Sequence, residues 1–345
     1  MRSFLKPAAG LTCLFALTVT GCSSSSDDSS DAAPSAPQKA STAPSESPSS
    51  TPSSSTSYAP YVSVTTASDM DGTGSPTTYN LAFAIASGSS CTPKWNGTTA
   101  IGNAAVKSRI AALKTSGATV RVSFGGASGK ELAETCTSVT ALAKAYGETL
   151  DAAGSTQADF DIEGDTLTDS ASVALRSKAI AVLQKERTDL KVSFTLPVMP
   201  SGLDSDSLAL LESANDNAVQ VSTVNIMTMN YGESYTKDMG DYAITSATAT
   251  HTQLKKVFGL SDAGAWQGMA LTSMIGVNDV SGETFSLSDA AQVRTFAEEK
   301  EIAWVSMWST FRDQQCESGS SDDDAATDCS GVAQSSGAFG EAFAG

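Results

Sequence analysis

The chain has 345 residues, 38 acidic and 21 basic side chains, a formal net charge of -17 and a pI near 4.3. Such a negative protein would repel a phosphate backbone, so nucleic acid is excluded as the expected partner. The single histidine, His251, gives little material for a Ser-His-Asp triad or a histidine-based metal site. We expect His251 on the surface of a helix, and we predict neither a metal nor a cofactor.

Residues 1–22 have the features of a secretory signal. Arg2 and Lys6 precede the apolar run Ala8–Thr20, which is too short to span a bilayer. The small residues that end this run, followed by Cys22, resemble a bacterial lipobox in which the cysteine is lipidated and becomes the first mature residue. An ordinary signal peptide that contains a cysteine is the alternative. We therefore expect an exported protein, either a cell-surface lipoprotein or a secreted one, with membrane contact only through the lipid anchor.

Residues 23–57 consist almost entirely of Ser, Thr, Pro, Ala and Asp, without a large aliphatic side chain before the end of the segment. Such a composition cannot bury enough apolar surface to fold, so it predicts a disordered linker that proline keeps somewhat extended. Residues 58–345 have a globular composition without a second break of this kind, which favours one large domain. We expect this domain to be monomeric.

Four cysteines remain for an oxidising compartment: Cys91, Cys136, Cys316 and Cys329. Cys316 and Cys329 bracket a polar loop, so we pair them, and the pairing of Cys91 with Cys136 follows. Neither pair has the spacing of a zinc or redox site. The acidic run Asp322–Asp324 lacks the spaced ligands of a calcium loop and is interpreted as a solvated turn.

Strand and helix patterns alternate through the domain. The predicted strands are Tyr61–Thr65, Asn80–Ala86, Thr119–Phe124, Ala158–Glu163, Lys191–Leu196, Thr223–Met229, Gly268–Ile275 and Ala303–Trp308. The helical patterns between them include Ala104–Lys114, Ser138–Ala152, Ala171–Glu186, Ser207–Asn217 and Asp289–Glu299. Eight strands alternating with helices predict an α/β fold of the (β/α)8 TIM-barrel type, in preference to an open doubly wound sheet.

Three acids occupy alternate positions of the fourth predicted strand: Asp159, Asp161 and Glu163. Side chains alternate between the faces of a strand, so all three point the same way while Phe160 and Ile162 point the other way. Three adjacent carboxylates are unfavourable unless their pKa values are separated, which indicates a titrating site. An exposed strand with a polar face is the alternative.

In a (β/α)8 barrel the functional side chains lie at the carboxyl ends of the strands. Gly125 and Gly126 predict a tight turn that lets a ligand approach the backbone, since no phosphate-binding motif follows. Met227 and Met229 alternate on a strand and either fill the barrel or contact a ligand. Trp308, at the end of the last strand, is either a sugar platform or a core residue.

The order of two motifs, Ser123-Phe124-Gly125-Gly126 followed by Asp159-x-Asp161-x-Glu163, resembles glycoside hydrolase family 18, the chitinases and their relatives. The resemblance covers most of the chain from Tyr58 to Gln314. Several phrases are similar in particular to a bacterial and archaeal subgroup of chitinases: Phe194–Pro197, Asn225–Met229, Met274–Asp279 and Ser306–Ser309.

The resemblance implies a retaining mechanism without an enzyme nucleophile. Glu163 would protonate the glycosidic oxygen and later activate water, while the N-acetyl carbonyl of the substrate attacks the anomeric carbon. Asp161 would hold the acetamide N–H, and Asp159 would share a proton or hydrogen bond with Asp161. The substrate implied is chitin or another N-acetylglucosamine oligosaccharide.

The resemblance also implies that Tyr231 contacts the acetamide and that Trp308 floors the subsite of the distorted sugar. The resemblance and the strand ends together give these candidate substrate-binding residues: Phe124, Gly125, Gly126, Met227, Met229, Asn230 and Trp308.

Two positions depart from the family pattern. Thr156 replaces a supporting aspartate, and Asn230 stands where relatives often have aspartate, while Glu163 is intact. The alternatives are an endo-β-N-acetylglucosaminidase that acts on N-glycans or wall glycan, and a chitin-binding protein without activity, which the three retained acids disfavour. Whether Trp95 and Trp266 lie along a groove or pack in the core stays open at this stage, as does endo or exo action.

Overall fold

The computed structural model describes residues 56–320 and 327–345, which belong to a single unit of the chain, Pro52–Gly345. The predicted signal, Cys22, most of the predicted linker and the run Asp322–Asp324 lie outside the described residues. Among the helices in those two ranges, none is both long enough and apolar enough to cross a bilayer.

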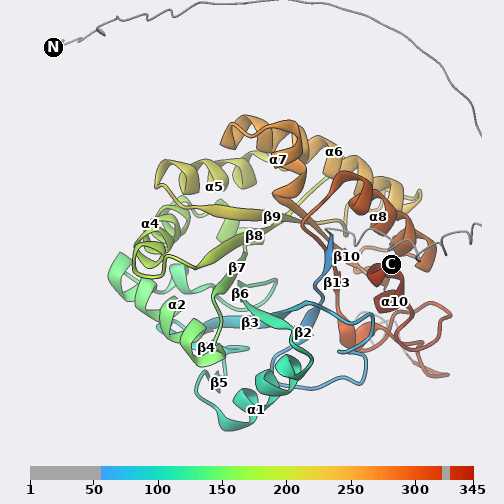
Figure 1. The fold of residues 1–345 in the computed structure, drawn as a ribbon, viewed down its shortest axis with the longest axis horizontal. Coiled ribbons are helices and arrows are strands. Elements are labelled where there is room, and N and C mark those ends of the chain that lie inside the picture. Colours follow the sequence, from blue (N-terminus) through green and yellow to red (C-terminus); the bar gives the residue numbers. More distant parts are fainter. Residues whose placement is uncertain (1–55, 321–326) are drawn as a thin grey trace, which may run out of the picture. The chain divides into compact units, whose positions relative to one another are not determined.

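Within the described residues, eight parallel strands form the centre of the fold (Figure 1): β2 (Tyr61–Ser63), β3 (Thr78–Ser87), β6 (Thr119–Gly125), β7 (Gln157–Asp161), β8 (Lys191–Pro197), β9 (Val221–Met227), β10 (Met269–Met274) and β13 (Trp304–Trp308). Their order in the sheet follows the chain order throughout. All eight strands predicted from the sequence are present, and their ends differ from the prediction by at most two residues.

The first segment of the barrel closes the ring. A short strand, β1 (Ser57–Tyr58), pairs in parallel with β13, while β2 pairs in parallel with β3. Only Ala59 and Pro60 separate β1 from β2, and the Ala59 N–H still donates to the Val305 carbonyl at 2.9 Å. One segment therefore bridges the last and the first long strands, and the predicted (β/α)8 barrel is confirmed.

Helices lie around the outside of the strands (Figure 1): α1 (Ala104–Leu113), α2 (Val139–Ala153), α4 (Ser170–Glu186), α5 (Ser205–Asp216), α6 (Met239–Phe258), α8 (Leu287–Lys300) and α10 (Ala338–Ala344). The shorter elements are β4 (Ser90–Trp95), β5 (Thr99–Ala100), η1 (Lys114–Ser116), η2 (Leu132–Glu134), α3 (Gly164–Thr168), α7 (Asp262–Gln267), β11 (Gly276–Val277), β12 (Thr284–Phe285) and η3 (Thr310–Arg312). The described connection between β2 and β3, residues 64–77, contains no helix, so the first unit of the barrel departs from the ideal pattern.

The ends of helix α2 show why it forms where it does. Ser138 accepts a hydrogen bond from the Ala141 N–H at the start, and Gly154 adopts a left-handed conformation, φ 58°, at the end. Leu142, Tyr146 and Leu150 recur every four residues on its buried face. This stripe packs the helix against the barrel.

The strands separate an aromatic outer layer from a polar interior. Phe124 and Phe160, on β6 and β7, stack with ring centroids 5.4 Å apart beneath Tyr146 of α2. On the other face of the strands, hydroxyl and amide side chains replace the branched aliphatic residues that usually fill such barrels. Asn225, for example, donates to Thr195 at 3.0 Å and to Thr272 at 2.8 Å. Hydrogen bonds therefore tie neighbouring strands together inside the barrel.

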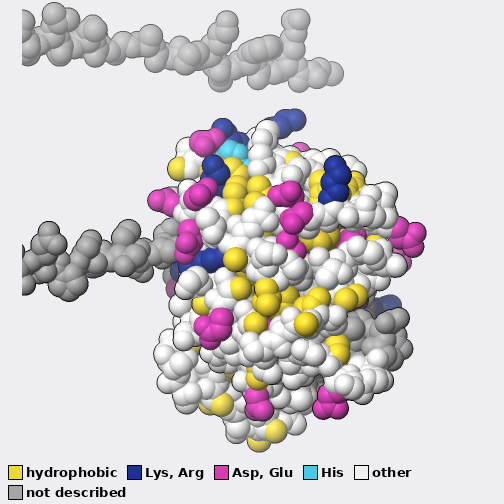
Figure 2. Space-filling view, turned by 90° about the vertical axis from the view of Figure 1, so that its right-hand side faces the viewer, with side chains coloured by type: hydrophobic (Ala, Val, Ile, Leu, Met, Phe, Trp, Pro, Cys, Tyr) yellow, Lys and Arg dark blue, Asp and Glu magenta, His cyan; other side chains and the backbone are white. Residues whose placement is uncertain are grey.

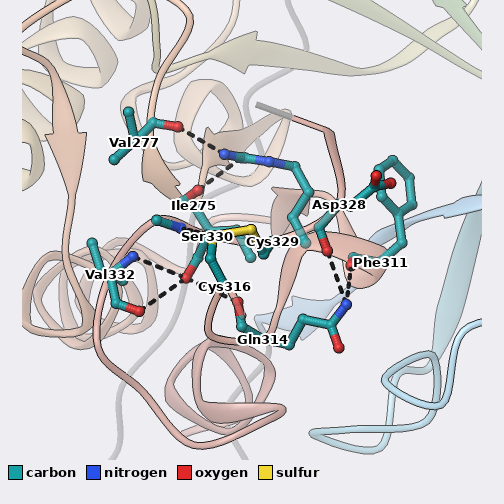
Figure 3. The surroundings of a disulfide bond; sticks show 11 residues. Ile275, Val277, Phe311, Gln314, Cys316, Asp328, Cys329, Ser330 and Val332 are labelled. Carbon is teal, nitrogen blue, oxygen red and sulfur yellow. Dashed lines mark hydrogen bonds between the residues drawn. A yellow bond between two sulfur atoms is a disulfide. The ribbon is translucent and has the colours of Figure 1, made fainter. Parts of the chain in front are cut away.

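Both predicted disulfides are confirmed. Cys91–Cys136 joins β4 to the loop before α2. Cys316–Cys329 lies in the segment after η3, where Gln314 donates to the Asp328 carbonyl at 2.8 Å (Figure 3).

The prediction for His251 is wrong in one respect. The residue lies on helix α6, but it is only 7% exposed, because its ring stacks on Trp266 at 4.0 Å between centroids. Trp95 is fully buried and donates to the Ile101 carbonyl. Both tryptophans whose role the sequence left open are therefore packing residues.

Candidate active site

The carboxyl ends of the strands surround a cavity of about 160 Å³. The residues that line it are Tyr61, Phe83, Ala127, Asp161, Glu163, Thr195, Met227, Met229, Asn230, Thr272, Met274, Asp279 and Trp308. Asp161 and Glu163 both line the cavity, and so do four of the seven predicted binding residues: Met227, Met229, Asn230 and Trp308. The position of this cavity matches the location of catalytic sites in barrels of this class.

Backbone geometry explains why Asp161 and Glu163 share this cavity. Strand β7 ends at Asp161, two residues earlier than predicted, and Glu163 precedes helix α3. The Glu163 backbone is still extended, with φ -133° and ψ 165°, and the Ile162 N–H donates to the Thr195 carbonyl of β8. The alternation of side chains therefore continues past the end of the strand.

Asp159 lies two residues before Asp161 on the same face of β7, and hydroxyl groups hold it inside the barrel. Ser123 donates to it at 2.7 Å, Ser193 at 2.6 Å, Thr195 at 2.9 Å and Tyr61 at 3.1 Å. Asp159 is 1% exposed, so these donors replace the water that its carboxylate loses on burial. Asp159 therefore acts on Asp161 in this structure through its charge and not through a direct hydrogen bond.

Asp161 and Glu163 form a coupled pair. Burial raises the pKa of the Asp161 carboxyl well above its ordinary value, and the neighbouring charges of Glu163 and Asp159 raise it further. Burial also raises the pKa of Glu163, while its hydrogen bond with Asp161 lowers that pKa and the charge of Asp279 raises it. Two carboxyl groups can hydrogen-bond only if one carries a proton, so this pair retains a proton above the ordinary range for acids.

One oxygen of Asp161 has no partner. The residue is 4% exposed, yet its Oδ1 makes no hydrogen bond within the described part of the chain. An unsatisfied buried carboxylate oxygen is unfavourable by about 1–3 kcal/mol or more. Asp161 lines the cavity, and this oxygen keeps its capacity to accept a hydrogen bond.

Gly125 and Gly126 contact the backbone of Asp161. Gly125 and Gly126 have φ values of 103° and 93°, and the Gly126 N–H donates to the Asp161 carbonyl at 2.9 Å. A Cβ on Gly125 would collide with the same carbonyl oxygen. Neither glycine lines the cavity, so the structure places them as supports of Asp161 and not at a ligand, contrary to the prediction.

Aromatic rings form one wall of the cavity. Trp308 is half-buried and stacks on Phe83 with centroids 5.5 Å apart, and the Tyr61 ring meets it edge-on at 5.9 Å. A partly exposed indole beside acid groups offers a flat apolar face, which sugar rings favour. Trp308 therefore lines the cavity, and its role as a sugar platform stays a prediction.

Asn230 and Asp279 also line the cavity. Asn230 adopts a left-handed conformation, φ 55°, and its amide donates to Asp279 Oδ2 at 3.0 Å. Met227 and Met229, which the sequence left between barrel filling and ligand contact, both line the cavity. The amide at position 230 thus orients a fourth carboxylate toward the site.

Two predicted site residues lie away from the cavity. Tyr231 is 4% exposed, packs against Tyr235 and Tyr242, and accepts a hydrogen bond from Ser246. Phe124 is fully buried in the outer aromatic layer described above. Neither side chain is placed to touch a ligand, so both assignments are corrected.

The sequence did not identify seven residues that line the cavity: Tyr61, Phe83, Ala127, Thr195, Thr272, Met274 and Asp279. Tyr61 and Phe83 lie on predicted strands, but nothing in their local sequence indicates which face they occupy. Asp279 had a detectable signal, because it is an acid four residues after the end of the predicted strand Gly268–Ile275.

The cavity defines a class of protein. A (β/α)8 barrel with a proton-sharing acid pair at its carboxyl end, next to an aromatic wall, is suited to acid–base chemistry on a sugar.

The comparisons make the class more specific. The chain is 34% identical over 275 residues to a probable bifunctional chitinase/lysozyme of Escherichia coli (strain K12), covering 74% of this chain and 31% of that protein. It is 34% identical over 276 residues to endochitinase 11 of Metarhizium anisopliae, covering 74% of this chain and 52% of that protein. The chain thus spans about a third of the first of these curated relatives and about half of the second. No protein-family model matches the chain.

Solved structures with a similar fold are also chitinases. The catalytic domain of a hyperthermophilic chitinase from Pyrococcus furiosus has a TM-score of 0.74 and 29% identity, with 86% of this chain and 96% of that chain covered. A GH18 chitinase from Pseudoalteromonas aurantia, 13% identical over 74% of this chain and 94% of its own, shares the fold with a TM-score of 0.53. The chain is therefore similar in sequence to proteins named as chitinases, and it shares the fold of a GH18 chitinase.

Proposed function

We propose that this protein hydrolyses β-1,4-linked N-acetylglucosamine polymers, either chitin or its oligosaccharides. The observation that supports this proposal best is the unpartnered Oδ1 of Asp161. It lies in a cavity together with Glu163 and the partly exposed ring of Trp308. An acetamide N–H is a donor that such an oxygen would accept, and a pyranose ring is a ligand that such a ring would stack against.

The chemistry needs only groups that line the cavity and the substrate itself. Glu163 donates its proton to the glycosidic oxygen, and the bond between that oxygen and the anomeric carbon breaks. The acetamide oxygen of the same sugar forms the new bond to the anomeric carbon, which gives a cyclic oxazolinium ion. Asp161 accepts the acetamide N–H and stabilises the positive charge.

The second half of the reaction restores the protein. Glu163, now a carboxylate, takes a proton from water while the water oxygen bonds to the anomeric carbon and the acetamide oxygen leaves. Both inversions occur at the same carbon, so the product keeps the β configuration. The dependence on an N-acetyl group is the reason why this mechanism excludes cellulose and starch.

The raised pKa of the acid pair fits this role. A general acid is effective when its pKa lies near the working pH, and burial moves Glu163 in that direction. Glu163 acts as acid only when protonated, so the rate falls as the pH rises through the pKa of the pair. A binding protein without activity would have no use for the unfavourable burial of two adjacent carboxyl groups.

The test is product analysis with the full-length protein. We expect N-acetylglucosamine oligomers to be cleaved, and Glu163→Gln to lower kcat by at least about 10³-fold, because the amide cannot donate a proton to the leaving oxygen. Oligosaccharide affinity should change little. The matched control is Glu212→Gln, which removes an acid from the exposed face of α5.

Equal activity of Glu163→Gln and the unmodified protein would contradict the assignment. Cleavage of N-glycans without cleavage of N-acetylglucosamine oligomers would instead identify an endo-β-N-acetylglucosaminidase.

We also propose that the protein is exported and monomeric, with Cys22 as the site of a lipid anchor and residues 23–57 as a linker to the barrel. Two disulfides in the folded domain support an oxidising location. Fractionation of the producing cell tests the anchor: recovery of the protein exclusively in the medium would exclude it.

A further inference from the structure

A second cavity adjoins the first and includes none of the residues of the aromatic wall. It has a volume of about 240 Å³. The residues that line it are Glu163, Pro197, Val198, Met199, Asp204, Met227, Met229 and Asn230. Glu163, Met227, Met229 and Asn230 belong to both cavities, so the two cavities meet at the proposed general acid.

The reaction assigns a sugar to each cavity. The sugar that is attacked must have its acetamide beside Asp161, which lines only the first cavity. The general acid must reach the oxygen between this sugar and the next one. Because Glu163 lies where the cavities meet, the second cavity receives the leaving part of the chain. This step rests on the proposed function.

The second cavity differs chemically from the first. Pro197, Val198 and Met199 give it aliphatic walls in place of the aromatic wall. Apart from Glu163, its charged group is Asp204, an exposed residue. No lysine or arginine lines either cavity in the described part of the chain. A cationic ligand would therefore meet a carboxylate and no lysine or arginine side chain.

Asp204 is held in place but retains accepting capacity. It is the N-cap of α5, and its Oδ1 accepts the Ser207 N–H at 2.8 Å. A carboxylate has about four acceptor positions, so one backbone hydrogen bond leaves room for a ligand donor. The cap fixes the direction of the side chain and so reduces the entropy lost on binding.

We propose that Asp204 binds the ammonium group of a glucosamine residue in the leaving position, so that the enzyme cleaves partially deacetylated chitin between N-acetylglucosamine and glucosamine. The acetylated sugar stays in the first cavity, because its amide oxygen is the nucleophile. The leaving sugar takes no part in that step and needs no acetyl group.

The charge of the whole protein favours the same ligand. A net charge of -17 attracts a polycation over long range and raises its association rate at low salt. On the face shown in Figure 2, acidic side chains are scattered with fewer basic ones between them, and hydrophobic side chains gather in a band across the middle.

The experiment uses partially acetylated chito-oligosaccharides of defined sequence and identifies, by mass spectrometry, the sugar at each new non-reducing end. That sugar occupied the leaving position before cleavage. We expect Asp204→Asn to lower the ratio of glucosamine to N-acetylglucosamine at these ends by roughly two- to fivefold, the effect of one solvent-exposed ion pair. Asparagine caps a helix about as well as aspartate, so α5 should keep its start.

Asp206→Asn is the matched control. It removes the same charge from the first turn of the same helix, but Asp206 lines neither cavity. The ratio should stay that of the unmodified protein. An unchanged ratio in Asp204→Asn, or an equal fall in both variants, would overturn the inference.

Fully acetylated oligomers separate this inference from the proposed function. If the unmodified protein cleaves them while Asp204→Asn leaves the ratio unchanged, only the role of Asp204 fails. If the unmodified protein cleaves neither substrate, the proposed function fails and the inference fails with it.

Discussion

The two ends of the barrel treat a buried charge in opposite ways. At the amino end of the strands, Arg121 donates to Asn80 at 2.6 Å and to Gln157 at 3.1 Å, and its guanidinium lies 3.9 Å from the ring centre of Trp304. At the carboxyl end, Asp161 is buried to a similar degree but keeps an oxygen without a partner. The difference teaches that one end is completed by the protein and the other by a ligand.

The difference between the two ends of the barrel predicts that substitutions at the carboxyl end have the largest effect, and that this effect is on turnover. We expect Asp161→Asn to lower kcat by about 10²- to 10³-fold, because the amide carries no charge to stabilise the cationic intermediate. KM should change much less, and the urea midpoint should stay close to that of the unmodified protein. Steady-state kinetics on N-acetylglucosamine oligomers provide the measurement.

Asp189→Asn, an exposed change in the turn before β8, controls for the loss of one negative charge. A kcat for Asp161→Asn within a few-fold of this control would reject the proposed acetamide contact.

The opposite end should respond in stability and not in turnover. Arg121→Met removes the guanidinium N–H groups that donate to Asn80 and Gln157, but it keeps an apolar side chain against Trp304. We expect the free energy of unfolding to fall by about 1–3 kcal/mol, since buried acceptors lose their partners. Urea denaturation measures this fall, and kcat should stay within about twofold. A large fall in kcat without loss of stability would show that the two ends are not separate in function.

The smallest expected effect concerns pH. The charge of Asp279 raises the pKa of Glu163, so Asp279→Asn should lower that pKa. Glu163 must be protonated to act as the acid, and activity is lost as the pH rises through its pKa. The alkaline limb of kcat/KM should therefore move to lower pH, on the order of a few tenths of a unit, because an exposed charge is screened by water.

A shift of the alkaline limb to higher pH would contradict the sign of this coupling. Because Glu163 and Asp161 titrate as a pair, the limb reports the pair and not one residue.

The sequence predicts the barrel and the acid motif well, since both depend on local periodicity. Strands of alternating pattern and the spacing of Asp159, Asp161 and Glu163 are visible without knowledge of neighbours in space. Tyr61 and Phe83 could not be assigned to the cavity in this way. Tyr61 is placed by the pairing of β2 with β3, and Phe83 lies where the register of β3 against β6 shifts.

Tyr231 shows where periodicity fails. Strand β9 ends at Met227, and the left-handed backbone of Asn230 breaks the alternation before Tyr231. The tyrosine therefore turns toward helix α6, where Ser246 meets its hydroxyl. His251 illustrates the same limit, because its stacking partner Trp266 lies on another helix.

The segment that closes the ring also ties the order of biosynthesis to competence. Ser57 of β1 pairs with Trp304, and Tyr61, the first residue of β2, donates its hydroxyl hydrogen to Asp159. A nascent chain cannot finish this arrangement until the ribosome has made nearly the entire domain. The first barrel strand to be synthesised is thus among the last to acquire both its neighbours.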